Sequence, residues 1–142
     1  MIVPDVNLLV YAHVKDMPHH ERAHKWWTQV INGEESVGLA WSVITGFIRI
    51  TSTRELFSQP LSVEQACQVA DSWLANPLIC QLHPSADHLS HVQRVATEIK
   101  SNGRIIPDLH LAVLAFEHGG TVYSADSDFA RFGMGKWINP LA

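Results

Sequence analysis

Four aspartates carry the chemistry that the sequence suggests. Asp126 and Asp128 lie one residue apart in the stretch TVYSADSDF, directly after an apolar run, and Asp5 follows the apolar residues MIVP at the N-terminus. Asp108 begins the helical pattern PDLHLAVLAF. Carboxylates that gather in one place repel one another and raise at least one pKa, and a bound hard cation removes that repulsion. Carboxylate oxygens without a positioned Cys or His favour Mg²⁺ or Mn²⁺ over Zn²⁺.

Each of these acids also has a purely structural interpretation when it is taken alone. Aspartate is favoured at the N-cap of a helix, and an acid in the first helical turn gains about 0.3–1 kcal/mol from the helix dipole. Capping does not explain why several acids fall at positions that can converge on one edge of a sheet. A bound Mg²⁺ or Mn²⁺ makes water a nucleophile and stabilises charge on a phosphodiester. The aspartates therefore indicate the chemistry of a metal-dependent nuclease.

Short apolar runs and helical patterns alternate along the chain, and this alternation positions the acids. It predicts an α/β sandwich around a mainly parallel sheet. Ligand sites in such sheets lie beyond the carboxyl ends of the strands, and Asp5 and Asp126 both follow predicted strands. Residues 42–53 fit either a helix or a strand, because β-branched residues are frequent there. The predicted strands cover residues 1–3, 36–40, 78–82, 121–125 and 136–140, and the other predicted helices cover 6–14, 19–32, 62–75, 85–103, 107–120 and 126–132.

The composition indicates one folded domain that spans residues 1–142. Hydrophobic residues make up 46% of the chain and charged residues 17%, a balance typical of globular proteins. The formal net charge of −4 argues against a broad basic surface for nucleic acid, but it allows local contacts. No apolar run is long enough to cross a bilayer, and the N-terminus lacks the features of a signal peptide. The chain has only two cysteines, Cys67 and Cys80, and we expect both to be buried. Taken together, these features predict a cytoplasmic protein.

Three stretches of the chain, VPDVNLLVYA, IPDLHLAVLAFEHGGTVYSADSDF and the terminal WINP, resemble PIN-domain proteins. The chain looks more closely like the VapC-type toxins of bacterial toxin–antitoxin pairs, and the resemblance covers essentially its whole length. It implies a PIN-like three-layer α/β/α sandwich and a single-domain endoribonuclease that uses Mg²⁺ or Mn²⁺. It also implies a cognate antitoxin whose C-terminal segment blocks the site, a homodimer, and a transfer or ribosomal RNA as substrate.

Carried over by position, the resemblance assigns metal ligation to Asp5, Asp108 and Asp126. It makes Asp128 an auxiliary acid of the D-x-D-F element, either close to the ion or bound to it through water. We expect cleavage by a metal-activated water to leave a 5′-phosphate and a 3′-hydroxyl. Replacement of Asp5 or Asp108 by Asn should then abolish cleavage while the fold is kept.

Four further residues complete the predicted site. Asn7 and Ser124 match the polar positions that usually support the first and last acids. Gly46 stands where such proteins usually carry another acid, so the choice between one and two metal ions stays open. Arg49, in the otherwise apolar stretch GFIRI, is a candidate contact for RNA, and we expect it to need a partner.

Gly46 also motivates a second class of function, a catalytically silent PIN-like module that binds RNA or an antitoxin. A phospho-acceptor receiver domain and an aspartate-nucleophile phosphatase fit less well. The receiver domain lacks an acceptor aspartate after residues 36–40, and the phosphatase lacks a D-x-D element after the first strand. The enzyme and the silent module differ in whether metal-dependent cleavage occurs.

Two sets of ring side chains have alternative interpretations. His20 and His24 have a spacing that can bind zinc, but the E-x-x-H context is absent, so we prefer a solvated helix face. The five tryptophans could stack on bases, but packing in the core or in a dimer is the preferred interpretation.

Overall fold

A five-stranded parallel sheet forms the centre of the protein in the computed structural model, which describes residues 1–100 and 102–142. The strand order is β3-β2-β1-β4-β5, and each neighbouring pair is parallel. Since β1 and β4 are neighbours, the segments that leave their carboxyl ends start side by side. The strands are β1 Ile2–Pro4, β2 Val37–Ala40, β3 Ile79–Leu82, β4 Thr121–Tyr123 and β5 Lys136–Ile138.

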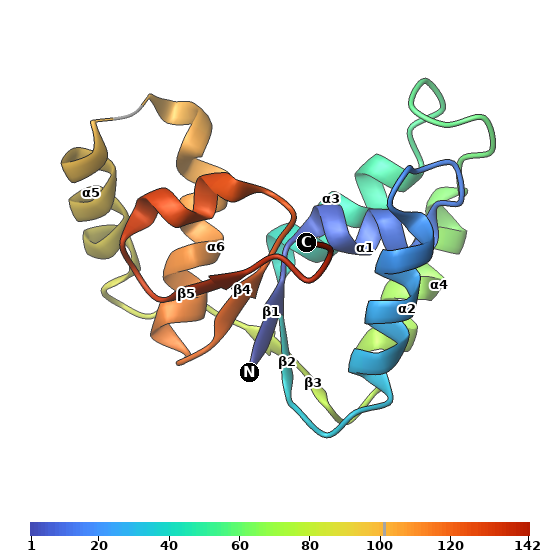
Figure 1. Cartoon of the computed structure of the whole chain (residues 1–142), viewed down its shortest axis with the longest axis horizontal. Coiled ribbons are helices and arrows are strands. Elements are labelled where there is room, and N and C mark those ends of the chain that lie inside the picture. Colours follow the sequence, from blue (N-terminus) through green and yellow to red (C-terminus); the bar gives the residue numbers. More distant parts are fainter. Residues whose placement is uncertain (101) are drawn as a thin grey trace.

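Helices cover both faces of this sheet. The helices α1 to α4 lie on one side, and α5 and α6 lie on the other (Figure 1). The 3₁₀ segment η2 packs against α5 and α6. The predicted three-layer α/β/α sandwich is therefore confirmed. The helical segments are α1 Val6–His13, α2 His20–Ile31, α3 Trp41–Thr51, α4 Val63–Leu74, α5 His88–Ile99, η1 Gly103–Ile105, α6 Ile106–Glu117 and η2 Ser127–Phe132.

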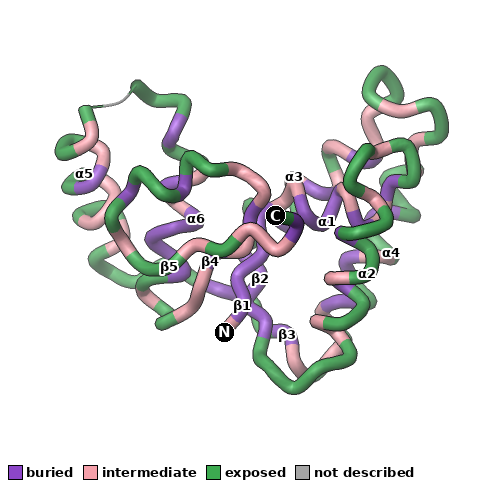
Figure 2. Tube along the Cα trace, viewed as in Figure 1, coloured by how far each residue is buried: buried purple, intermediate pink, exposed green. Residues whose placement is uncertain are grey.

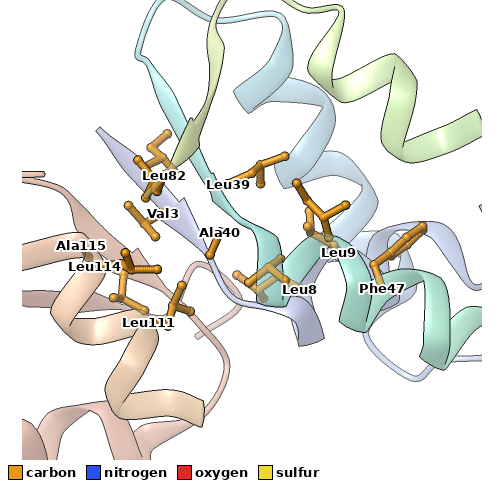
Figure 3. Close-up of a cluster of buried hydrophobic side chains, with 14 of the residues drawn as sticks. Val3, Leu8, Leu9, Leu39, Ala40, Phe47, Leu82, Leu111, Leu114 and Ala115 are labelled. Carbon is orange, nitrogen blue, oxygen red and sulfur yellow. The ribbon is translucent and has the colours of Figure 1, made fainter. Parts of the chain in front are cut away.

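Apolar side chains from both helical layers pack on the central strands. Leu111 and Leu114 of α6 lie toward Val3 of β1, and Leu9 of α1 lies beside Phe47 of α3 (Figure 3). The strands β1 and β2 are buried along their whole length (Figure 2). Strands that are covered on both faces carry continuous apolar runs. For this reason the sequences of β1 and β2 do not alternate between apolar and polar residues.

The structure settles the ambiguous segment 42–53 and shortens one predicted helix. Residues 41–51 form α3, whose buried residues Val43, Ile44 and Phe47 follow helical spacing. The helix predicted for 85–103 was too long, because α5 ends at Ile99 and Lys100 adopts a left-handed conformation with φ 52°. Residue 101, within that predicted helix, lies outside the described residues.

Two predictions of burial were wrong. Cys67 and Cys80 are both exposed, because Cys67 lies away from the buried residues of α4 and Cys80 lies on the edge strand β3. Trp27 and Trp73 are buried in the core as predicted, and Trp41, the first residue of α3, is 44% exposed, so packing in a dimer stays a prediction for it. None of the helices in the described part of the chain has both the length and the apolar character needed to cross a membrane.

Candidate metal centre at the carboxyl edge of the sheet

The carboxyl ends of β1 and β4 hold the two strand-end aspartates together. The backbone N–H of Asp5 donates to the carbonyl oxygen of Tyr123 at 2.8 Å, which joins the residue after β1 to the end of β4. Asp5 caps α1, since its Oδ1 accepts from the Val6 N–H at 2.7 Å. Asp126 caps η2, since its Oδ1 accepts from the Asp128 N–H at 2.9 Å. Asp5 and Asp126 are therefore both N-caps, but capping uses only one oxygen of each carboxylate.

The buried hydroxyl of Ser124 connects the polar groups at this edge. It donates to Asp5 Oδ2 at 2.7 Å and accepts from Asn7 Nδ2 at 3.3 Å and from the Asp126 N–H at 3.0 Å. A hydroxyl has one hydrogen and two lone pairs, so these three bonds use its full capacity. The Trp137 indole N–H donates to the Ser124 carbonyl oxygen at 3.0 Å, which fixes the backbone at the same point. Trp137 was predicted to pack in the core or in a dimer like the other tryptophans, and this hydrogen bond was not predicted.

Asp108, in the first turn of α6, adds a third helix-start acid to this edge. One carboxylate oxygen each from Asp108, Asp126 and Asp128 lie within 4.8 Å of one another. Asp5 lies outside this set of three, although its charge acts on Asp108. Asp5 is only 8% exposed, and both its oxygens are hydrogen-bonded. The structure thus groups the predicted auxiliary acid Asp128 with two predicted ligands, and Asp5 lies outside this group.

Like charges change the titration of these acids. Burial, and then the charges of Asp5, Asp126 and Asp128, raise the pKa of Asp108 to about 6. Burial also raises the pKa of Asp5, while its hydrogen bonds from Ser124 and Val6 oppose this shift and the charge of Asp126 adds to it. Neither raised pKa has a cationic partner as a cause, so the cluster carries repulsion that a bound cation would relieve.

The donor set fits a hard divalent cation. The three grouped side chains offer only carboxylate oxygens, which are the ligands that Mg²⁺ and Mn²⁺ prefer. Asn7 Oδ1 is buried and has no hydrogen-bond partner among the described residues. A buried acceptor without a donor is unusual, and a cation or a water held by one would satisfy it. The residues that could hold an ion are therefore Asp108, Asp126 and Asp128, with Asp5 and Asn7 beside them.

Gly46 and Arg49 lie on α3 and contribute no carboxylate. A Cβ placed on Gly46 would lie 3.4 Å from Val6 Cγ2, so this glycine faces the residue that follows Asp5. Arg49 is exposed, so the expectation that it needs a partner was wrong. Its guanidinium is accessible to solvent and to ligands.

Comparison with known proteins identifies the family of this site. The PIN domain family model matches residues 2–134. Ribonuclease VapC33 of Mycobacterium tuberculosis is 34% identical over 141 residues, with 99% of both chains aligned. The chain is a PIN-domain protein of the VapC family. Ribonuclease VapC43 of the same organism is 39% identical to it over 141 residues, covering 99% of this chain and 96% of that relative.

Solved VapC structures share the fold of this family member. VapC20 of Mycobacterium tuberculosis, described as a sarcin–ricin loop cleaving toxin, aligns with a TM-score of 0.71 at 15% identity over 94% of this chain and 96% of that one. VapBC2 of Rickettsia felis, solved with a DNA fragment from its promoter, aligns with a TM-score of 0.70 at 17% identity over 98% of both chains. The predicted PIN-like fold and the predicted family are confirmed.

Proposed function

We propose that this VapC-family protein is a metal-dependent endoribonuclease and the toxin of a toxin–antitoxin pair. The observation that carries the proposal is the set of three carboxylates within 4.8 Å of one another at the carboxyl edge of the sheet. Its relatives are named ribonucleases, and several solved structures of its fold are VapBC complexes. We also propose that residues 1–142 form one PIN domain.

Some side chains of the site would bind the ion, and others would orient its ligands. Asp108, Asp126 and Asp128 would hold Mg²⁺ or Mn²⁺, with the predicted ligand Asp5 close by. Ser124 keeps Asp5 in place through the hydrogen bond to Oδ2. When bound, such an ion activates water and stabilises charge on the scissile phosphodiester.

Asn7 supports this arrangement through its bond to Ser124, and its buried Oδ1, which has no hydrogen-bond partner among the described residues, is a further oxygen ligand that the ion could use. Arg49 is proposed to contact RNA phosphate, since an exposed guanidinium can bind it in bidentate geometry. The proposed partners are a cognate antitoxin protein, an RNA such as a transfer or ribosomal RNA, and a second copy of the chain. The proposed location is the cytoplasm.

A cleavage assay tests this function. The untagged protein, freed of antitoxin, is incubated with total bacterial RNA in Mg²⁺, in Mn²⁺ and in EDTA, beside Asp108→Asn. The exposed Asp71 on α4 gives a matched control, Asp71→Asn. We expect discrete products with either metal and none in EDTA. Asp108→Asn should lower the rate by at least about 100-fold, because even residues that only orient metal ligands contribute 10–100-fold.

The alternative, a catalytically silent module, is favoured by Gly46, which brings no carboxylate to the site. It predicts the opposite result in the same assay. A folded, metal-supplied protein that cleaves no RNA and still binds an antitoxin would support the silent module and overturn the nuclease.

A further inference from the structure

Two imidazoles from α2 close the carboxyl end of α1. His20 Nδ1 lies 2.8 Å from the Tyr11 carbonyl oxygen, and His24 Nδ1 lies 3.2 Å from the Ala12 carbonyl oxygen. Carbonyls in the last turn of a helix lack partners within that helix, so these side chains satisfy them. The predicted solvated helix face is confirmed for the exposed His24, and the hydrogen bonds of both rings to α1 were not predicted.

These hydrogen bonds fix which nitrogen of each ring carries hydrogen. A carbonyl oxygen only accepts, so Nδ1 is the donor in both His20 and His24. In the neutral ring, Nε2 then carries the lone pair and points away from α1. Imidazoles that bind metals usually donate their other N–H to a carboxylate or a backbone carbonyl, which is the arrangement present here.

The spacing of the rings suits a shared ion. Their centroids are 5.5 Å apart and their planes differ by 30°. Two imidazoles that bind one ion through Nε2, with metal–nitrogen distances of about 2.0–2.1 Å and a tetrahedral angle, have centroids about 5 Å apart. The centroid distance of His20 and His24 therefore matches that of two rings on one ion, and their Nε2 atoms would share it once the rings turn toward each other.

The surroundings leave the remaining coordination positions open. His24 is exposed, and His20 is partly exposed and lines a surface hollow with Lys15 and Glu21 that His24 does not line. Among the described residues, sets of three or more grouped ligands are confined to the aspartates, so this pair would be completed by water. Imidazole suits Zn²⁺, Ni²⁺ and Cu²⁺, whereas carboxylates suit Mg²⁺ and Mn²⁺.

We propose that His20 and His24 form a second metal site, for a divalent transition-metal ion such as Zn²⁺, separate from the carboxylates. An ion there bridges one turn of α2 and holds both rings in the conformation that closes α1. It stabilises the α1–α2 pair and binds independently of the ion at Asp108 and Asp126.

Metal titration of the untagged protein tests this site, with excess Mg²⁺ present to occupy the carboxylates. We expect Zn²⁺ to raise the melting temperature by a few degrees. We expect bound Cu²⁺ to show an electron paramagnetic resonance spectrum with hyperfine coupling to two imidazole nitrogens. His20→Asn and His24→Asn should each weaken Zn²⁺ binding by at least about tenfold. An Asn side chain can still donate to the α1 carbonyls, so both variants should fold.

His118→Asn is the matched control, because His118 is also exposed and also bonded to a backbone carbonyl, that of His83 at 2.9 Å. It should bind Zn²⁺ like the wild type. Coupling of Cu²⁺ to one nitrogen, or unchanged Zn²⁺ affinity in His24→Asn, would overturn the proposal.

Discussion

Removal of the charge at Asp108 should stabilise the protein when no metal is bound. Burial and three neighbouring aspartates raise the pKa of Asp108 from 3.8 to about 6, so its ionised form is disfavoured in the folded state. A shift of this size corresponds to about 3 kcal/mol. Solvent screening of a partly exposed side chain reduces the figure to about 1–2 kcal/mol. Asp108→Asn should therefore raise the free energy of unfolding by that amount at pH 7.5.

The sign of the pH dependence follows from the raised pKa. Between about pH 4 and pH 6 the folded protein keeps the Asp108 proton that the unfolded chain has lost. The contribution of this group to stability is thus full below about pH 4 and is lost as the pH rises through about 6. Asparagine does not titrate, so the stability difference between variant and wild type should be near zero at pH 4 and maximal above pH 6.5.

Equilibrium unfolding in urea with EDTA, followed by tryptophan fluorescence, measures this difference at a series of pH values. The buried Trp27 and Trp73 provide the signal. Subtraction of the wild-type free energy of unfolding from that of the variant removes the contributions of groups that titrate in both proteins. Asp71→Asn, at an exposed position on α4, should show no pH-dependent difference. An Asp108→Asn variant that is less stable than wild type at pH 7.5 would refute the crowded-carboxylate reasoning.

Three further substitutions test other parts of the structure. Ser124→Ala should lower the free energy of unfolding by about 1–3 kcal/mol in thermal or chemical denaturation, because it leaves Asp5 Oδ2 buried without its donor. A variant as stable as the wild type would contradict the hydrogen-bond network around Ser124. Gly46→Ala should stabilise α3 by about 0.5–1 kcal/mol in the same measurement, since the added Cβ meets only ordinary contacts. A loss of stability would show that α1 and α3 pack more tightly than described. Glu117→Gln should cost about 1–2 kcal/mol at pH 7, because the carboxylate is bonded to His88. In spite of burial, its hydrogen bonds and the charge of His88 lower the pKa of Glu117. The cost of the substitution should therefore disappear in acid. A cost that persists at pH 3 would contradict the assignment of the bond between Glu117 and His88.

Much of the fold could be predicted because strand and helix periods differ and because turn residues mark their ends. The segment 42–53 could not be assigned, since its β-branched residues have strand propensity and its helical form depends on burial of Val43, Ile44 and Phe47. The end of α5 was missed because a left-handed Lys100 has no sequence signal comparable to glycine.

The four acids were found because aspartates after strands and at a helix start stand out in an apolar context. Their meeting at one edge of the sheet was also predicted, but which three of them group was not predictable, since it depends on which oxygens the capping bonds use. Asp5 has both oxygens occupied by Val6 and Ser124, whereas Asp128 projects beside Asp126. The hydrogen bonds of the two α2 histidines were missed for a related reason, because their partners are carbonyls of another helix.

The ends of the RNA products test the central claim most directly. Total bacterial RNA cleaved by the wild-type protein in Mg²⁺ would be sequenced with a method that captures only 5′-phosphate ends, with EDTA and Asp108→Asn reactions in parallel. Hydrolysis at the carboxylate cluster predicts new 5′-phosphate ends at discrete positions that are absent from both parallel reactions. Products with 5′-hydroxyl ends, or the same ends from Asp108→Asn, would contradict the assignment of this site.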